Sequence, residues 1–270
     1  MTTTTTYLLR DSRTMLRRNV RRMLRYPSLT VMLVGMPVVF LLLFVFVFGG
    51  TLGSGLGGPA AGLTGRAAYA NYVVPGILLM TIAGAVQGTA ISIAMDMTEG
   101  IVAQFRTMSI SRTSVLTGHV IGSLIQVFVG LVAVTAVAFA VGFRPAAGMG
   151  GWLGAIGLLV LAGLAMIWLA VALGLKAKSV ETASNTPMIL MLLPFLSSGF
   201  VPTDSMPTAL RWFAEYQPFT PVIETLRALL SGTSVGVTGL VAVGWCVVIA
   251  GTGHLWSRRL YERASIRPRG

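Results

Sequence analysis

The sequence predicts an all-α, polytopic membrane protein with six transmembrane helices. Of its 270 residues, 54% are hydrophobic and only 10% are charged, whereas soluble domains carry about 25% charged residues. The apolar residues also gather into six long runs, and an α-helix of about 20 apolar residues crosses roughly 30 Å of hydrocarbon. We therefore expect a single transmembrane domain over residues 1–270.

The six predicted spans cover residues 29–49, 72–95, 116–142, 152–175, 183–201 and 235–255. The helix-breaking pair Tyr26-Pro27 precedes the first span, and a glycine-rich connector follows it. The fifth span contains Pro187 and Pro194, and proline is tolerated in a membrane helix where neighbouring helices satisfy the freed carbonyl groups. We expect this span to be kinked and packed inside the bundle.

Basic residues are distributed unequally between the two sides of these spans. Sixteen of the 20 Lys and Arg residues lie in the N-terminal segment, the connections after the second and fourth spans, and the C-terminal tail, against four on the other side. An excess of Lys and Arg marks the cytoplasmic side. Both termini and residues 99–112 are therefore predicted to be cytoplasmic. Arginines beside membrane spans favour anionic lipid headgroups, not nucleic acid, as the partner.

Residues 7–25 are predicted to form an amphipathic helix in the plane of the headgroups. Apolar residues recur at helical spacing, while Arg10, Arg13, Arg17 and Arg21 form another face. The alternative is a simple topology anchor. A secretory signal is disfavoured because the apolar run that follows exceeds the 7–15 residues of a signal core.

The sequence shows none of the usual patterns of a catalytic or metal site. Every Asp and Glu falls at the edge of a span or outside one, and Cys246 is the single cysteine. His119 and His254 lie near the ends of runs and are predicted to be helix-end polar residues. The nucleotide-binding pattern GxxxxGK[ST] does not occur in the sequence. We expect no catalytic residue, metal or cofactor in this chain, and an energy source outside it. A transporter driven by an ion gradient would place ionisable residues within its spans.

The stretch EGIVAQFRTMSISR, residues 99–112, is a polar island between two hydrophobic runs. As a helix it places Ile101, Val102, Phe105 and Met108 on one apolar face, while Glu99 lies near the positive end of the helix dipole. It is predicted either to lie on the membrane surface or to fit a groove on a cytoplasmic partner.

Residues 194–232 follow the fifth span at its outer end. ALRWFAEYQP and PVIETLRALLSG are predicted to be two short amphipathic helices, separated by Gln217-Pro218 and closed by Gly232. Two half-length helices at the outer surface indicate a re-entrant hairpin over residues 203–231, which must pack in protein or line a cavity.

Four stretches together resemble the permease subunit of ABC-2 type exporters, in particular the daunorubicin-resistance branch. They are YVVPGILLM at 72–80, EGIVAQFRTMSISR at 99–112, SSGFVPTDSMP at 197–207 and FAEYQPFTPVIETLRALLSG at 213–232. The resemblance implies a bacterial inner-membrane protein that pairs with a second permease copy or paralogue. It also implies a separate cytoplasmic P-loop ATPase, which binds the ATP and Mg²⁺.

The same resemblance implies roles for two sets of residues. The coupling helix, which contacts the ATPase, would include Glu99, Gly100, Val102, Phe105, Arg106, Ser109, Ser111 and Arg112. The outer gate would include Phe200, Pro202, Trp212, Phe213, Glu215, Gln217, Pro218, Glu224 and Arg227.

The expected cargo is a hydrophobic or amphipathic, drug-like compound that is moved outward. The resemblance implies the outward direction and a path between the permeases along spans one, two and five. A path lined by residues such as Phe40, Phe44, Met80, Met191 and Phe195 would favour an apolar cargo. The alternatives are export of a lipid or polysaccharide precursor, a gradient-driven transporter, and a membrane-embedded enzyme or scaffold.

Overall fold

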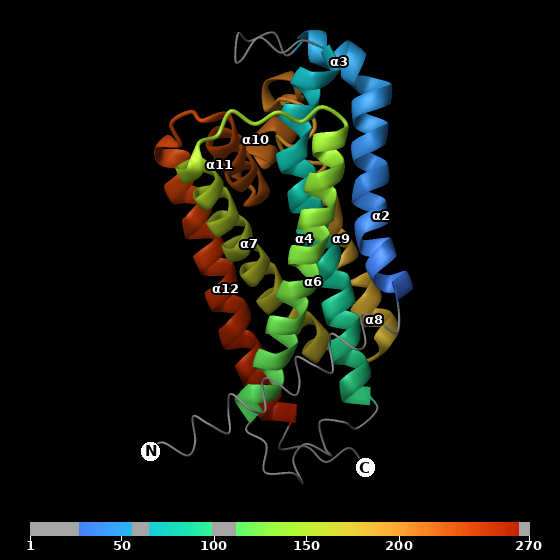
Figure 1. The fold of residues 1–270 in the computed structure, drawn as a ribbon. Helices are drawn as coiled ribbons and strands as arrows, with labels where there is room; N and C mark the ends of the chain where they lie inside the picture. Colours follow the sequence, from blue (N-terminus) through green and yellow to red (C-terminus); the bar gives the residue numbers. More distant parts are fainter. Residues whose placement is uncertain (1–26, 56–64, 99–111, 265–270) are drawn as a thin grey trace.

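The computed structural model describes residues 27–55, 65–98 and 112–264, and the side chains of 33–54, 65–98 and 117–262 among them. The described chain is helical and contains no strand. Its long helices stand side by side in one bundle (Figure 1). The predicted all-α class is confirmed for these residues.

Five helical stretches are long and apolar enough to cross a membrane. The first is built from α2 (Pro27–Leu43), the π-helical turn η1 (Phe44–Phe48) and α3 (Gly49–Gly55). The other four are α4 (Gly65–Thr98), α6 (Arg112–Ala140), α7 (Met149–Lys176) and α12 (Gly236–Ala264). Each of these five overlaps one of the six predicted spans, although α4 begins seven residues earlier and α12 ends nine residues later than predicted.

Residues 183–201, predicted as one kinked span, do not form one continuous helix. The segment consists of α8 (Val180–Asn185), α9 (Met188–Leu192) and turns that continue to Phe200. Pro187 and Pro194 explain the interruptions, because proline lacks the N–H that continues a helix and clashes with the preceding turn. Figure 1 places α8 towards the lower end of the bundle, α9 about halfway and α10 near the upper end. The interrupted segment therefore runs along most of the bundle.

Helix α4 forms the centre of the bundle. It packs against α2, α6, α7, α8 and α11, and most of its length between Tyr69 and Asp96 is buried. Helix α12 lies at the edge, against α7 and α11, and exposes apolar side chains such as Val237 and Leu240. Helices that are apolar on all sides suit a lipid environment.

Two short helices complete the upper end of the bundle. A 3₁₀ turn, η3 (Thr203–Ser205), leads into α10 (Thr208–Tyr216) and then α11 (Phe219–Ser231). Gly232 ends α11 in the left-handed conformation with φ 71°, which favours glycine. Both helices lie where the sequence predicted them, on either side of Gln217-Pro218.

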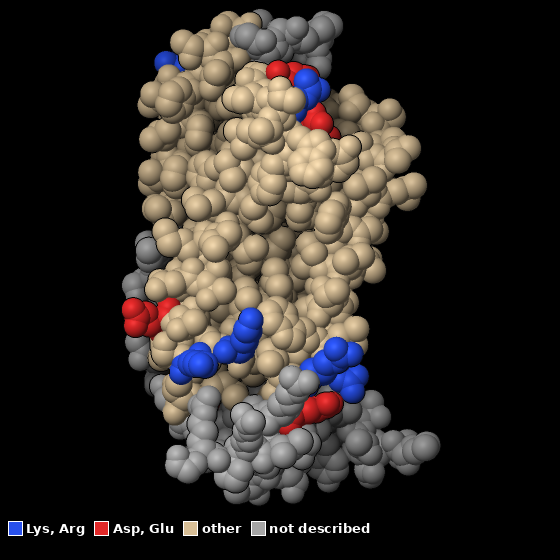
Figure 2. All heavy atoms as spheres, turned by 180° about the vertical axis from the view of Figure 1, so that it is seen from behind, with Lys and Arg blue, Asp and Glu red and all other residues tan. Residues whose placement is uncertain are grey.

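On the face that Figure 2 shows, the charged side chains lie towards the two ends of the molecule and leave an uncharged belt between them. At the lower end, α7 finishes at Lys176, and α12 carries Arg258 and Arg259 near its end. At the upper end, α4 begins beside Arg66, and Arg144 follows α6. Lys176, Arg258 and Arg259 thus lie at one end and Arg66 and Arg144 at the other, as the charge count predicted. Which end is cytoplasmic stays a prediction.

A contact between two glycines joins α4 to the interrupted segment. A Cβ atom built on Gly76 would lie 2.8 Å from the carbonyl oxygen and 2.9 Å from the Cα of Gly199. Real Cβ atoms do not approach backbone that closely, so one of the two backbones would have to move. The small size of Gly76 therefore sets the distance between α4 and the turn at 197–200.

We predict that Gly76→Ala destabilises the protein by about 1–3 kcal/mol, the usual cost of overpacking a close contact. Gly88→Ala on the same helix is the control, because a Cβ there meets nothing within 4 Å and alanine favours a helix by up to about 1 kcal/mol. Thermal unfolding in detergent would compare them. Equal stability of the two variants would show that Gly76 is not needed for this contact.

Candidate functional site

The two helices of the upper hairpin are packed differently. Helix α11 is largely buried, whereas Ala214 is the buried residue of α10. The α10 side chains Trp212 and Phe213 are 68% and 41% exposed, as amphipathic interface residues would be. Helix α11 therefore packs into the bundle, and α10 covers it at the surface.

Arg227 of α11 joins three parts of the chain. Its Nη2 donates to the carbonyl of Ser198 at 2.8 Å and to that of Tyr72 at 3.3 Å. Its guanidinium carbon lies 3.9 Å from the centre of the Tyr72 ring, and Glu224 contributes a nearby opposite charge. The Tyr72 hydroxyl also donates to the Ser198 carbonyl at 2.9 Å. One cation thus links α11, α4 and the turn at 197–200.

Other side chains supply donors to the same interrupted segment. Gln217 Nε2 donates to the carbonyls of Leu193 and Leu196 at 3.1 and 2.6 Å, and the Tyr69 hydroxyl donates to that of Phe200 at 3.0 Å. Buried carbonyl groups that a broken helix leaves free need such partners. The hairpin and α4 therefore supply side-chain donors to four backbone carbonyls within residues 193–200.

Two buried atoms in this region have no partner among the described residues: Ser198 Oγ and Gln217 Oε1. An unsatisfied buried polar atom costs about 1–3 kcal/mol relative to a paired one. The upper end therefore contains hydrogen-bonding capacity that this arrangement leaves unused, which lowers the cost of rearranging it.

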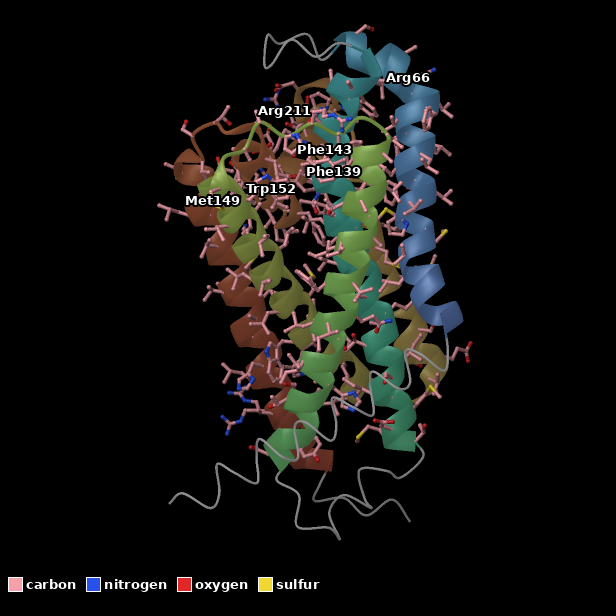
Figure 3. The ribbon with its side chains drawn as sticks, in the orientation of Figure 1. Arg66, Phe139, Phe143, Met149, Trp152 and Arg211 are labelled. Atoms are coloured by element: carbon pink, nitrogen blue, oxygen red, sulfur yellow. The ribbon has the colours of Figure 1, made fainter. Side chains whose placement is uncertain are left out.

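An exposed ion-pair group lies on the surface of the hairpin. Arg211 on α10 contacts Asp204 at 2.8 Å and Glu215 at 2.7 Å, and Figure 3 shows it near the upper end of the molecule. Hydrogen bonding to Glu215, with the charges of Glu215 and Asp204, raises the pKa of Arg211. Solvent screening makes such surface pairs weak, so this group contributes less to the hairpin than the buried Arg227.

A cluster of phenylalanines lies where the first helical stretch meets the interrupted segment. Its ring centres are 5.3 Å apart for Phe40 and Phe195, 4.6 Å for Phe44 and Phe200, and 4.8 Å for Phe195 and Phe200. Phe48 continues the cluster at 5.7 Å from Phe44. The π-helical turn begins at Phe44, and such turns are frequent at functional sites. Phe200 is buried and Phe40, Phe44 and Phe195 are partly buried, so the cluster is an aromatic packing contact between the first helical stretch and the interrupted segment.

The structure brings together only some of the predicted gate residues. Phe200, Gln217 and Arg227 contact the interrupted segment or form part of it, and Glu224 is close to Arg227. Pro202 and Pro218 precede η3 and α11 as their N-cap residues. Trp212, Phe213 and Glu215 lie apart from these, on exposed α10. Sequence reasoning missed Tyr69 and Tyr72, although YVVPG begins with the second of them.

The predicted residues of the cytoplasmic side fall mostly outside the described part of the chain. Those outside it are Glu99, Gly100, Val102, Phe105, Arg106, Ser109, Ser111, Arg10, Arg13, Arg17 and Arg21. Arg112 is the first residue of α6. Their roles stay predictions.

Asp96 and His119 form a buried polar pair that sequence reasoning did not foresee. His119 Nε2 lies 3.0 Å from Asp96 Oδ2, and the two side chains are 10% and 7% exposed. Asp96 lies two residues before the end of α4, and His119 lies seven residues into α6. Antiparallel helices bring positions near their shared connection together, so the location of both residues near the facing ends of two successive helices was a usable signal. The pair fastens α4 to α6 beside the segment 99–111.

Among the described residues, no group of three or more His, Cys, Asp or Glu side chains could hold a metal ion. Cys246 is buried in α12.

We predict that Arg227→Lys loosens the hairpin. Lysine keeps the charge but loses the planar fork that reaches both carbonyl groups, and a lost bond to a charged donor costs about 1.5–3 kcal/mol. Hydrogen exchange in residues 197–230 should become faster. Arg211→Lys, on the exposed face of the same hairpin, is the control and should leave exchange unchanged. Equal exchange in the two variants would rule out Arg227 as the link.

We also predict that His119→Leu destabilises the protein by about 3–5 kcal/mol, because it leaves the Asp96 carboxylate buried without this partner. Adding Asp96→Asn should recover part of the loss, since the charge is then removed. Chemical unfolding of the two single variants and the double variant measures the coupling. Strictly additive losses would mean that the two side chains do not interact.

Comparison with known proteins agrees with this architecture. The family described as ABC-2 type transporter matches residues 10–231. The chain is also 27% identical, over 230 residues, to the daunorubicin resistance ABC transporter permease protein DrrB1 of Streptomyces coeruleorubidus. That alignment covers 83% of this chain and 78% of that protein. The resemblance predicted from four short stretches is confirmed, and the chain belongs to the ABC-2 type transporter family.

Proposed function

We propose that this chain is the membrane-spanning permease subunit of an ATP-driven exporter for a hydrophobic or amphipathic, drug-like compound. The observation that carries the proposal is family membership across residues 10–231, since the name of the relative describes it as a permease protein of a daunorubicin resistance ABC transporter. In this proposal the interrupted segment crosses the bacterial inner membrane as a sixth passage, with both termini in the cytoplasm.

The energy would come from a separate cytoplasmic ATPase. The sequence has no GxxxxGK[ST] pattern with which to bind ATP phosphates. ATP and Mg²⁺ would therefore be bound by the partner, and this subunit would be non-catalytic. A second permease copy or paralogue would complete the path, because one bundle of this size has few helices to enclose it.

The apolar character of the path supports a hydrophobic cargo. The phenylalanine cluster lies between α2, η1 and the interrupted segment, and its rings are apolar. The cluster would offer the cargo stacking contacts at the middle and upper part of the bundle. The hairpin fastened by Arg227 would close the outer end, and release of its bonds to Ser198 and Tyr72 would open it.

A lipid or polysaccharide precursor is the alternative cargo. An amphipathic lipid would use the same aromatic surface, whereas a polysaccharide precursor requires polar contacts, which this cluster does not offer. Among the described residues, the buried pair of Asp96 and His119 is a candidate for a gradient-driven mechanism, since paired ionisable groups can relay protons. That pair lies near the end of α4 and the beginning of α6 and not midway along the bundle, which favours a structural role.

Residues 99–112 would receive the movement of the ATPase. They join α4 to α6, and the Asp96–His119 pair fastens those helices next to them. Glu99, Phe105 and Arg106 would contact the ATPase, with Phe105 at the centre of the apolar face. The amphipathic helix over residues 7–25 would add a second contact from the membrane surface.

We predict that Phe105→Asp abolishes copurification of the ATPase and export, because a charge at an apolar docking position is costly to desolvate. Thr107→Asp adds the same charge two residues away, on the opposite side of the helix, and should leave both largely intact. Affinity purification from native membranes, with detection of a soluble P-loop ATPase, measures binding. Normal ATPase recovery with Phe105→Asp would overturn the coupling assignment, and no associated ATPase in the native protein would overturn the proposed function.

A further inference from the structure

An apolar groove lies between α6 and α7, apart from the phenylalanine cluster and from the path proposed above. Its volume is about 360 Å³, and residues of α4 and α11 also contribute to its wall. Leu131, Ala155 and Leu230 are among its buried residues. Sites for small ligands have volumes of about 300–1,000 Å³, so the groove is large enough to hold part of a ligand.

The groove opens on the side of the bundle, at its outer surface. Four of its lining residues, Phe128, Val132, Ile156 and Val160, are between 44% and 55% exposed. They lie on helices that are long and apolar enough to cross a membrane. The molecules that meet this opening in a bilayer are lipid chains.

The groove is long and apolar. Its lining on α6 extends from Leu124 to Phe139, which is about 22 Å of helix at 1.5 Å per residue, compared with about 15 Å for half of the hydrocarbon core. Thr135 is the lining residue with a hydroxyl, and this group donates to the Leu131 carbonyl at 2.7 Å. A flexible hydrocarbon chain fits these walls better than a polar ligand.

The upper end of the groove has aromatic side chains and a cation. Phe139, Phe143 and Trp152 lie close together between α6 and α7 (Figure 3), with ring centres 5.4 Å apart for Phe139 and Phe143 and 6.2 Å for Phe139 and Trp152. Arg144 comes directly after Phe143 in the sequence, and its Nη1 donates to the carbonyls of Phe139 and Phe143 at 2.9 and 3.0 Å. These bonds fix an exposed guanidinium at the mouth of the groove.

Part of that guanidinium is available to a ligand. Among the described residues, no acceptor contacts Nε or Nη2 of Arg144. Arginine binds phosphate oxygens through several N–H groups at once. A phosphate at this position would lie at the end of the hydrocarbon belt, where headgroups of the bilayer begin.

We propose that the groove between α6 and α7 is a binding site for an anionic glycerophospholipid of the membrane. One acyl chain lies along the groove from Phe139 towards Leu124, and the phosphate contacts Arg144. The charge of Arg144 selects anionic headgroups, and the aromatic side chains hold the upper part of the chain. The site is separate from cargo transport and from the ATPase.

Trp152 provides a probe of this site. In a protein with Trp168, Trp212, Trp245 and Trp256 replaced by Phe, the fluorescence of Trp152 reports a brominated acyl chain in the groove. The protein is placed in phosphatidylcholine nanodiscs with increasing brominated phosphatidylglycerol, or brominated phosphatidylcholine of the same chains. Half-maximal quenching by phosphatidylglycerol should need about fivefold less lipid, since one arginine near an anionic headgroup contributes that factor.

Two variants and two controls separate the parts of the site. Arg144→Gln should bring the ratio of the two lipids close to one, while Arg66→Gln, at the same end on α4, should leave it unchanged. Ala136→Phe, from an exposed lining position, should fill the groove and weaken quenching by both lipids. Val248→Phe, exposed on α12 outside the groove, should not.

Retention of lipid by the protein with all of its tryptophans gives an independent measurement. Native mass spectrometry in detergent with added phosphatidylglycerol should show a retained lipid that Arg144→Gln and Ala136→Phe lose. Equal quenching of the Trp152 protein by the two lipids, with no retained lipid, would overturn the proposal. Absence of quenching by either lipid would also overturn it, because the groove would then be covered by something else, such as a second copy of the chain.

Discussion

The structure depends on side chains that donate hydrogen bonds to the backbone carbonyl groups of an interrupted helix. Inside a bilayer, water does not satisfy free carbonyl groups, so a broken helix is stable only where protein side chains replace the missing bonds. Here Gln217, Arg227, Tyr69 and Tyr72 donate to carbonyls between Leu193 and Phe200. The interrupted segment, α4 and α11 are therefore one hydrogen-bonded unit, and each is needed for the others to keep their places.

This dependence explains why the packing at the upper end is so close. Gly76 and Gly199 bring two backbones together without side chains between them, which places Tyr72 and Tyr69 within reach of the turn. The same region retains unused acceptors on Ser198 and Gln217. A region that is tightly packed but not fully hydrogen-bonded has alternatives available at modest cost, which suits a part of a transporter that must rearrange.

Local properties of the sequence predicted most of the helices. Long apolar runs predicted the five long helical stretches. Helical periodicity predicted α10 and α11, with Gln217-Pro218 marking the break between them and Gly232 marking the end of α11. The local structure of residues 183–201 could not be predicted in the same way. Pro187 and Pro194 indicated a disturbance, but whether a helix bends or unwinds depends on donors from distant parts of the chain, such as Arg227. The Asp96–His119 pair and the tyrosine contacts are likewise products of tertiary packing, which periodicity within a single helix does not show.

The position of α4 has a mechanical consequence. Asp96 fastens this helix to α6 at one end, and Tyr72 and Gly76 fasten it to the interrupted segment near the other. The 25 residues from Tyr72 to Asp96 lie within one helix and span about 36 Å at 1.5 Å per residue. A helix resists compression along its axis because its hydrogen bonds run in that direction. Pro75 removes one of these bonds near the upper attachment, so the continuous part of α4 extends from Gly76 to Asp96. A displacement of Asp96 along the axis would be transmitted through this part to the contact between Gly76 and Gly199.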